Sequence, residues 1–282
     1  MAVAAPPPLP VPPPIVVAPR PSLGQRAYEM IDDLGGVMLL ILSTVRCWFT
    51  PPWSYGGEFA DQSWILIKRC MIPTGISVFV FGYGPVGVEA GTFLRALGQV
   101  DRLGGVYSIG AVREYVPWVT GMVVAGVAGT AITADLGARR VREELDALAV
   151  MGVDAVRALV APRILALMLV LPLLNLVGLV FAALAGIVVE LADGGTSAGY
   201  FASFTAGFSP TDMFANVLKT AVFGFLVAVV CCYRGLNAKG GSEGVGRAVN
   251  QAVVQAFAAV WIFNFAFNAL YLAAFPGSLS VR

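Results

Sequence analysis

The chain has 282 residues, of which 58% are hydrophobic and only 12% are Asp, Glu, Lys or Arg. Soluble domains carry about 25% charged residues, so this composition excludes a soluble fold of the same size and indicates a polytopic membrane protein. A formal net charge of +1 leaves no basic surface for nucleic acid. The chain contains no histidine, which excludes His-ligated zinc sites and Ser-His or Cys-His catalytic pairs. The four cysteines are Cys47, Cys70, Cys231 and Cys232. They form no C-x-x-C pair, and we interpret them as small apolar membrane residues.

Residues 1–21 hold nine of the 18 prolines. Proline lacks the amide donor that a helix interior needs, so this segment cannot be helical. It is predicted to be a disordered cytoplasmic tail, and a polyproline ligand for a partner is the alternative. It lacks the basic start and apolar core of a signal peptide.

Residues 22–60 are predicted to form an interfacial region. The uncharged stretch 34–45 has 12 residues, which is too short to span a membrane that needs about 20. Charged residues precede it, and Arg46, Trp48 and Trp53 follow it. This pattern is typical of an amphipathic helix lying in the membrane interface.

Five further stretches are nearly free of charge and long enough to span a bilayer. Lys219 is the only charge inside them and is expected to extend to a membrane edge. We therefore predict an all-α integral membrane protein with five transmembrane helices. The stretches are 70–88, 115–134, 164–189, 213–233 and 248–281, and the helical part of the last is expected to end near Pro276.

The basic residues predict the orientation. With a cytoplasmic N-terminus, 13 of the 18 Lys and Arg fall on the inside and five on the outside, which favours an inside N-terminus and an outside C-terminus. The loop 190–212 contains no Lys or Arg and is the clearest outside segment.

Small residues mark the first two spans. Gly87 and Gly91 end the first, while Gly121, Ala125 and Gly129 recur every four residues in the second. This spacing lets helix backbones approach closely, so we interpret these residues as packing surfaces within or between subunits. A glycine-lined channel filter is the alternative.

The connection 135–163 is predicted to carry a short amphipathic helix on the cytoplasmic side. Its apolar stripe is Val141, Leu145, Leu148 and Met151. Opposite charges pair at i,i+4 as Arg139 with Glu143, Arg140 with Glu144 and Arg142 with Asp146. Gly152 is the expected C-cap. Either this is a solvated linker helix resting on the membrane, or it is a coupling helix that docks onto a cytosolic motor.

Three motifs stand out: residues 125–137 (A-G-V-A-G-T-A-I-T-A-D-L-G), residues 143–154 (E-E-L-D-A-L-A-V-M-G-V-D) with the following Pro162-Arg163, and residues 235–254. They resemble the motifs of the MlaE/YrbE permeases of MCE-associated ABC lipid transporters, and the chain looks most like the actinobacterial YrbE subunits of Mce systems. Two departures from the first motif are Val127, where the family usually has Arg, and Asp135, where it usually has Glu.

The resemblance implies a permease domain over residues 61–282. It implies a second YrbE-type subunit, a cytosolic ATPase of the Mkl/MlaF type, and MCE-domain proteins that form an outer ring or tube. The implied cargo is a hydrophobic lipid (phospholipid, fatty acid, mycolic acid or sterol), and the implied location is the plasma (inner) membrane. ATPase coupling then falls to Arg139, Arg140, Arg142, Glu143, Glu144, Asp146, Leu148 and Met151.

Arg113 and Glu114 match the Arg-Glu pair that MlaE places near its lipid cavity, although at a helix start they could equally be interfacial anchors. Glu89 is expected to face inward or to a partner, because ionisable groups at membrane depth are costly. The chain has no G-x-x-x-x-G-K-[ST] phosphate loop and cannot bind ATP by that route, and the resemblance implies that a separate chain hydrolyses ATP. We expect no catalytic residue, cofactor or metal. A membrane scaffold or channel is the alternative function, and an intramembrane carboxylate enzyme is disfavoured because no pair of Asp residues faces each other within the spans.

Overall fold

The computed structural model describes residues 23–50 and 56–275, which form helices joined by short turns, without any strand. Five helical runs in this part of the chain are long and apolar enough to cross a membrane, which confirms the predicted all-α class and the number of spans. The chain divides into two compact units after Gly36, and the second unit holds every described element except the beginning of the first helix. The predicted proline-rich tail lies outside the described residues.

The interfacial region contains helix α1 (Leu23–Phe49), which extends beyond the predicted 34–45 on both sides. From Val37 onward, Leu40 and Cys47 are buried, whereas Met38 and Leu42 expose apolar side chains. α1 does not belong to the five membrane-long runs. Its position in the membrane interface stays a prediction.

Three of the five runs contain π turns, in which the backbone hydrogen bonds skip one residue more than in an α-helix. The first run joins α2 (Gly56–Phe81), the π turn η1 (Gly82–Val88) and α3 (Glu89–Ala96). The second joins the 3-10 turn η2 (Val100–Arg102), α4 (Leu103–Gly110), π turn η3 (Ala111–Tyr115), α5 (Val116–Val124), π turn η4 (Ala125–Gly129) and α6 (Thr130–Val141). The third joins π turn η5 (Val156–Val160) and α8 (Ala161–Ala192), and the remaining two are α10 (Pro210–Leu236) and α11 (Gly241–Ala274).

The helices are longer than the uncharged stretches that predicted them. The first run, Gly56–Ala96, has 41 residues, which at 1.5 Å per residue amounts to about 60 Å. The hydrocarbon core of a bilayer is about 30 Å thick. The uncharged stretch therefore marks the part of each helix that fits the hydrocarbon, and the charged ends continue the helix into water.

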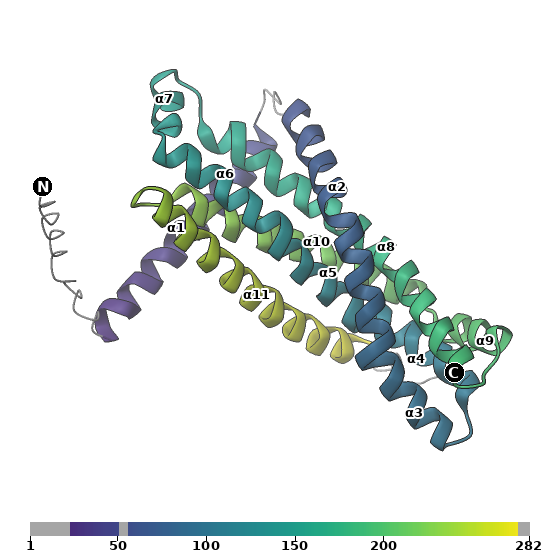
Figure 1. Ribbon diagram of the computed structural model, residues 1–282. Coiled ribbons are helices and arrows are strands. Elements are labelled where there is room, and N and C mark those ends of the chain that lie inside the picture. Colours follow the sequence, from purple (N-terminus) through teal and green to yellow (C-terminus); the bar gives the residue numbers. More distant parts are fainter. Residues whose placement is uncertain (1–22, 51–55, 276–282) are drawn as a thin grey trace, which may run out of the picture. The chain divides into compact units, whose positions relative to one another are not determined.

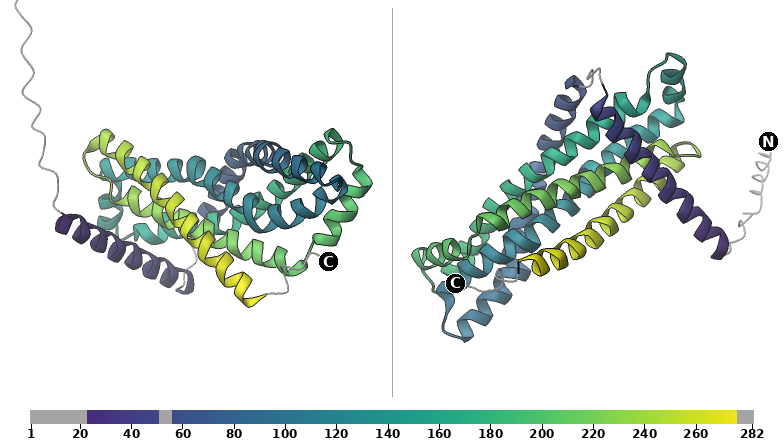
Figure 2. Two further views of the ribbon diagram at one scale, coloured as in Figure 1. Left: turned by 90° about the horizontal axis from the view of Figure 1, so that it is seen from below. Right: turned by 180° about the vertical axis from the view of Figure 1, so that it is seen from behind.

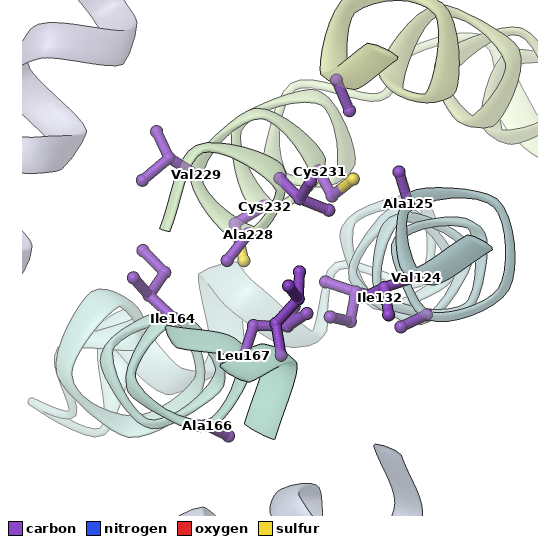
Figure 3. Close-up of a cluster of buried hydrophobic side chains, with 14 of the residues drawn as sticks. Val124, Ala125, Ile132, Ile164, Ala166, Leu167, Ala228, Val229, Cys231 and Cys232 are labelled. Atoms are coloured by element: carbon purple, nitrogen blue, oxygen red, sulfur yellow. The ribbon is translucent and has the colours of Figure 1, made fainter. Parts of the chain in front are cut away.

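α8 is the central helix of the second unit and packs against both α2 and α10, while α11 packs against α10 and α6 (Figure 1; Figure 2). The main apolar cluster gathers side chains from these helices around Leu167 of α8, with Ile132 of α6 and Cys232 of α10 among its members (Figure 3). α10 approaches α8 most closely at Gly224, where a Cβ atom would lie 2.8 Å from the carbonyl carbon of Leu167. Glycine at this position allows the two backbones to touch.

The predicted outside loop 190–212 is corrected, because it contains helix α9 (Ser197–Gly207). Thr196 caps this helix by accepting a hydrogen bond from the Gly199 amide at 3.1 Å. The carboxylate of Asp101 accepts from the amide and hydroxyl of Thr196, each at 3.3 Å, and so ties the helix to the turn before α4. With 11 residues, α9 is shorter than the roughly 20 that a membrane span needs, so the search for spans did not detect it.

Candidate functional site

A polar cluster lies among η3, α10 and α11, inside the membrane-long runs. It contains four ionisable side chains, two of each sign: Arg113, Glu114, Asp212 and Lys219. Arg113 and Glu114 were the predicted cavity residues, and the structure places them in the middle of the second run rather than at its start. Charges at this depth must be paired or hydrogen-bonded to be tolerated, and the contacts of each show how this is achieved.

Arg113 forms an ion pair with Asp212 at 2.8 Å, and the two side chains are only 16% and 5% exposed. The hydroxyl of Tyr271 donates a hydrogen bond to the same carboxylate. The centre of the Tyr271 ring also lies 5.9 Å from the Arg113 guanidinium carbon, within the range of a cation–π contact. One carboxylate and one aromatic residue therefore hold the arginine between α10 and α11.

Lys219 is buried and faces inward, which corrects the expectation that it extends to a membrane edge. Its ammonium donates to the backbone carbonyl of Arg113 at 2.6 Å and to the side-chain oxygen of Asn268 at 3.0 Å. Asn268 in turn donates to Glu114 at 2.7 Å. The lysine turns inward because these acceptors lie within reach on neighbouring helices, so burial does not leave its donors without partners.

The π turn η3 provides part of this cluster with backbone acceptors. A π turn displaces carbonyl groups from the regular α-helical pairing, and the carbonyl of Val112 accepts a hydrogen bond from the side-chain amide of Asn216. Asn175 of α8 donates to the Asn216 side-chain oxygen at 2.5 Å. The network thus links the second, third, fourth and fifth runs through polar contacts in an otherwise apolar interior.

The cluster borders a small pocket of about 40 Å³ that is also lined by Phe267 and Leu272. A cavity needs about 10–15 Å³ by this measure to hold one water molecule, so the pocket has room for a few waters and not for a lipid. Its four charges cancel. Glu89, the third predicted cavity residue, is exposed and does not line this pocket.

Sequence reasoning missed most of the cluster. Asp212 was placed in an outside loop, and no role was assigned to Asn216, Asn268 or Tyr271. The available signal was Lys219, a charge in the middle of an apolar stretch, which by itself marks a functional position in a membrane helix. Its partners lie on other helices, and helix periodicity carries no information about which helices meet.

A short helix lies between the second and third runs as predicted, but its bounds differ from the predicted residues 139–152. α6 ends at Val141, the backbone of Glu143 adopts a left-handed conformation with φ of 60°, and a separate helix α7 follows (Glu144–Val150). The predicted i,i+4 pairs therefore do not form. The observed pairs cross the turn, with Arg140 to Asp146 at 2.8 Å, Arg142 to Glu144 at 2.7 Å and Arg139 to Glu144 at 3.8 Å.

These pairs fold the acidic start of α7 back onto the basic end of α6. The hydrogen bond with Glu144, reinforced by its charge, raises the pKa of Arg142. Gly152 caps α7 as predicted, with φ of 75° and a hydrogen bond from the Val153 amide to the Leu148 carbonyl at 2.9 Å. The predicted apolar stripe does not share one environment: Leu145 is buried, whereas Met151 is exposed. Val150, the neighbour of Met151, has 90% of its surface exposed.

The small residues of the second run lie against α10 and α11. A Cβ atom at Gly121 would lie 3.1 Å from Phe223, and one at Gly129 would lie 2.7 Å from the sulfur of Cys231. Ala125 between them is buried. These positions bring helices of the same chain together.

Gly87 and Gly91 lie against α8 in the same way. A Cβ atom at Gly87 would lie 2.6 Å from Val189, and one at Gly91 would lie 3.0 Å from the same side chain. The first and third runs are therefore in close contact at the end of the molecule where α9 lies.

Comparison with known proteins matches residues 59–270 to the permease MlaE family. A probable ABC transporter permease protein of Rickettsia bellii is 26% identical over 89% of this chain and 96% of its own length. One from Synechocystis is 36% identical over 60% of this chain and 64% of its own length. The chloroplastic Arabidopsis thaliana protein TRIGALACTOSYLDIACYLGLYCEROL 1 is 32% identical over 62% of this chain and 50% of its own length.

The family match covers four of the five membrane-long runs almost completely, together with α7 and most of α11. It includes the polar cluster up to Asn268 and the whole of the corrected coupling segment. The match and the five spans lead to one conclusion: this multi-pass membrane protein belongs to the MlaE permease family.

Proposed function

We propose that the chain is the transmembrane permease subunit of an ABC-type lipid transporter of the Mce type, coupling a cytosolic ATPase to lipid movement across the cell envelope. The observation that carries this proposal is the α6–α7 segment. Its second helix, α7, lies outside the five spans, is braced against the end of α6 by ion pairs, and ends at an exposed apolar pair, Val150 and Met151. An exposed apolar pair on a braced helix is suited to docking into a partner protein.

The lipid part of the proposal rests on the polar cluster. Buried charges in a membrane protein mark substrate pathways more often than simple packing, and Arg113 and Glu114 match the family's cavity pair. The small pocket of about 40 Å³ must widen to admit a lipid, which fits a mechanism driven by ATP. A relative is named for a glycolipid, trigalactosyldiacylglycerol.

The proposed orientation places α7 in the cytoplasm of a plasma (inner) membrane, with the N-terminus inside and the C-terminus outside. The 13 basic residues assigned to the inside, against five assigned to the outside, support this orientation.

The proposed mechanism is mechanical. Closure of the ATPase pushes α7, and α6 transmits the displacement to α8 through Asp135, which pairs with Arg139 at 3.2 Å and with Arg163 at 2.6 Å. α8 contacts α2 and α10, so its movement reaches the polar cluster. A second YrbE-type subunit and outer MCE-domain proteins complete the transporter. A scaffold or channel subunit is the alternative, and it requires no ATPase.

The test is charge reversal of the turn into α7. We expect the double variant Glu143→Lys/Glu144→Lys to remain in the membrane. The amount of ABC ATPase that co-purifies with the complex from native membranes, measured by quantitative mass spectrometry, should fall at least tenfold. The matched control is Asp61→Lys/Glu243→Lys, which reverses two exposed acids elsewhere. Equal ATPase recovery from both variants would exclude the coupling role, and absence of any ATPase from the wild-type complex would favour the scaffold.

A further inference from the structure

A second cavity, of about 250 Å³, lies toward the α7 end of the helices, apart from the polar cluster. Residues of α2, the second run and α8 line it. Its polar lining residues are Gln62, Arg69, Asp135, Arg139 and Arg163, and five apolar side chains from α2 and the second run complete the wall. One water molecule needs about 10–15 Å³ by the same measure, so this cavity has room for a group as large as a phosphate with part of its ester.

Arg163 is the buried group of this cavity, with a side chain that is 3% exposed. Its Nη2 atom lies 2.6 Å from Asp135. Its Nε and Nη1 atoms are buried and have no hydrogen-bond partner among the residues that the structure describes. Buried donors of a guanidinium group are costly to leave unsatisfied, and this site therefore lacks an acceptor that the described part of the chain does not provide.

The charge of the lining shows which acceptor fits. Three guanidinium groups face one carboxylate, and Asp135 is already shared by Arg139 and Arg163. Glu144, which lies 3.8 Å from Arg139, does not line the cavity. The lining thus carries a net charge of +2 and favours an anion with several oxygens, for which arginine has the matching donor geometry.

The position of the charges along the helices sets their depth in the membrane. Arg69 directly precedes the uncharged stretch 70–88, Asp135 directly follows 115–134, and Arg163 directly precedes 164–189. Three charges from three helices therefore meet where the hydrocarbon ends. Phospholipid phosphates lie at this level, just outside the hydrocarbon core.

We propose that this cavity is a binding site for the phosphate group of an anionic phospholipid of the surrounding leaflet. The Arg163 donors and the Arg69 side chain contact the phosphate oxygens, and the apolar wall, which includes Ile65 and Ile132, contacts the start of the acyl chains. The bound lipid would brace α2, α6 and α8 at the place where α6 leads into α7. This site is independent of the proposed cargo and of the polar cluster.

The test measures ligand-dependent thermal unfolding of the complex in detergent, followed by intrinsic tryptophan fluorescence. The probes are dihexanoyl-phosphatidylglycerol, dihexanoyl-phosphatidylcholine and potassium phosphate, each compared with potassium chloride at equal ionic strength. We expect a saturable rise in the unfolding midpoint with phosphatidylglycerol and a weaker one with phosphatidylcholine. Arg69→Gln should reduce the apparent affinity roughly tenfold, or about 1.4 kcal/mol, and Arg163→Gln should abolish it.

Lys68→Gln is the matched control, because Lys68 is the exposed neighbour of Arg69 on the same helix and does not line the cavity. If Arg163→Gln fails to fold, Arg69→Gln and Arg139→Gln carry the test. Saturation by potassium phosphate alone, lost in Arg69→Gln, supports the oxyanion site and assigns it to a soluble phosphate instead of a lipid. The proposal is overturned if no probe gives a saturable shift, or if Lys68→Gln and Arg69→Gln weaken binding equally.

Discussion

The ion pair between Arg113 and Asp212 provides a quantitative test of the polar cluster. Asp212→Asn removes the negative charge, keeps the size of the side chain and leaves an oxygen that the Tyr271 hydroxyl can still reach. The change therefore isolates the charge–charge interaction. It leaves the Arg113 guanidinium largely desolvated beside a neutral amide.

The burial of the pair sets the expected magnitude. With side chains 16% and 5% exposed, the pair belongs to the buried class, for which removing one partner costs about 3–5 kcal/mol. Because the hydrogen bond from Tyr271 can be retained, we expect the lower end, about 3 kcal/mol. In a domain of this size, 1 kcal/mol moves the thermal midpoint by about 2–4 °C, so Asp212→Asn should lower it by roughly 6–12 °C.

The assay is thermal unfolding in detergent at one fixed scan rate. Glu243→Gln is the matched control, because Glu243 pairs with Arg247 at 2.6 Å but the two side chains are 84% and 59% exposed. An exposed pair contributes about 0–1 kcal/mol, and the control should shift the midpoint by less than about 4 °C. The double variant Arg113→Gln/Asp212→Asn should cost about 2 kcal/mol less than the sum of its single variants.

Two results would refute this reasoning. If Asp212→Asn and Glu243→Gln lower the midpoint equally, burial does not determine the strength of the pair. If the two single effects at Arg113 and Asp212 add without coupling, the contact at 2.8 Å contributes nothing specific to the fold.

Two further predictions concern packing and thiol chemistry. Gly224→Ala places a Cβ against the Leu167 backbone and should cost about 1–3 kcal/mol, whereas Gly246→Ala, with nothing within 4 Å, should be neutral or stabilising; thermal midpoints and membrane yield distinguish them. All four cysteines are buried, so N-ethylmaleimide at neutral pH should label none in the folded protein and four after denaturation, as counted by mass spectrometry. Burial, with a smaller contribution from Asp154, raises the pKa of the Cys47 thiol. Less of this thiol therefore ionises at any given pH, and its alkylation should become fast only in strongly alkaline buffer; rapid labelling at neutral pH would contradict its burial.

The spans were predictable because one physical requirement, the exclusion of charge from hydrocarbon, leaves a direct mark on composition. The same rule measures only the hydrocarbon part of each helix. The stretch 70–88 predicted the first span, and the structure continues that helical run to Gly56 and Ala96. A helix end in water is set by caps and turns, and charge counting does not detect them.

The turn at Glu143 was not predictable from periodicity. The charges around it satisfy i,i+4 pairing in a straight helix and cross-turn pairing in a broken one, so the pattern alone does not distinguish the two arrangements. A left-handed glutamate carries no sequence signal comparable to glycine. Gly152, where the left-handed conformation does fall on glycine, was predicted correctly as the end of the helix.

The cavity residues were predictable only in part, for a tertiary reason. Arg113 and Glu114 were identified through resemblance, whereas Asp212 and Asn268 are distant in sequence and become partners only when α10 and α11 pack beside η3. A hydrogen bond between residues 99 positions apart, such as that from Arg113 to Asp212, leaves no trace in either local segment.

The π turn η4 has a geometric consequence for the four-residue repeat that runs through it. Each residue of an α-helix rotates by about 100°, so three four-residue steps from Gly121 to Thr133 would turn the series by about 120° around the axis. A π turn accommodates one extra residue and cancels about 100° of this drift. Gly121 can therefore lie against Phe223 of α10, while Thr133 donates a hydrogen bond to the Cys231 carbonyl, also of α10, at 3.1 Å. In this way η4 keeps residues spaced by four on one side of a helix that has 3.6 residues per turn.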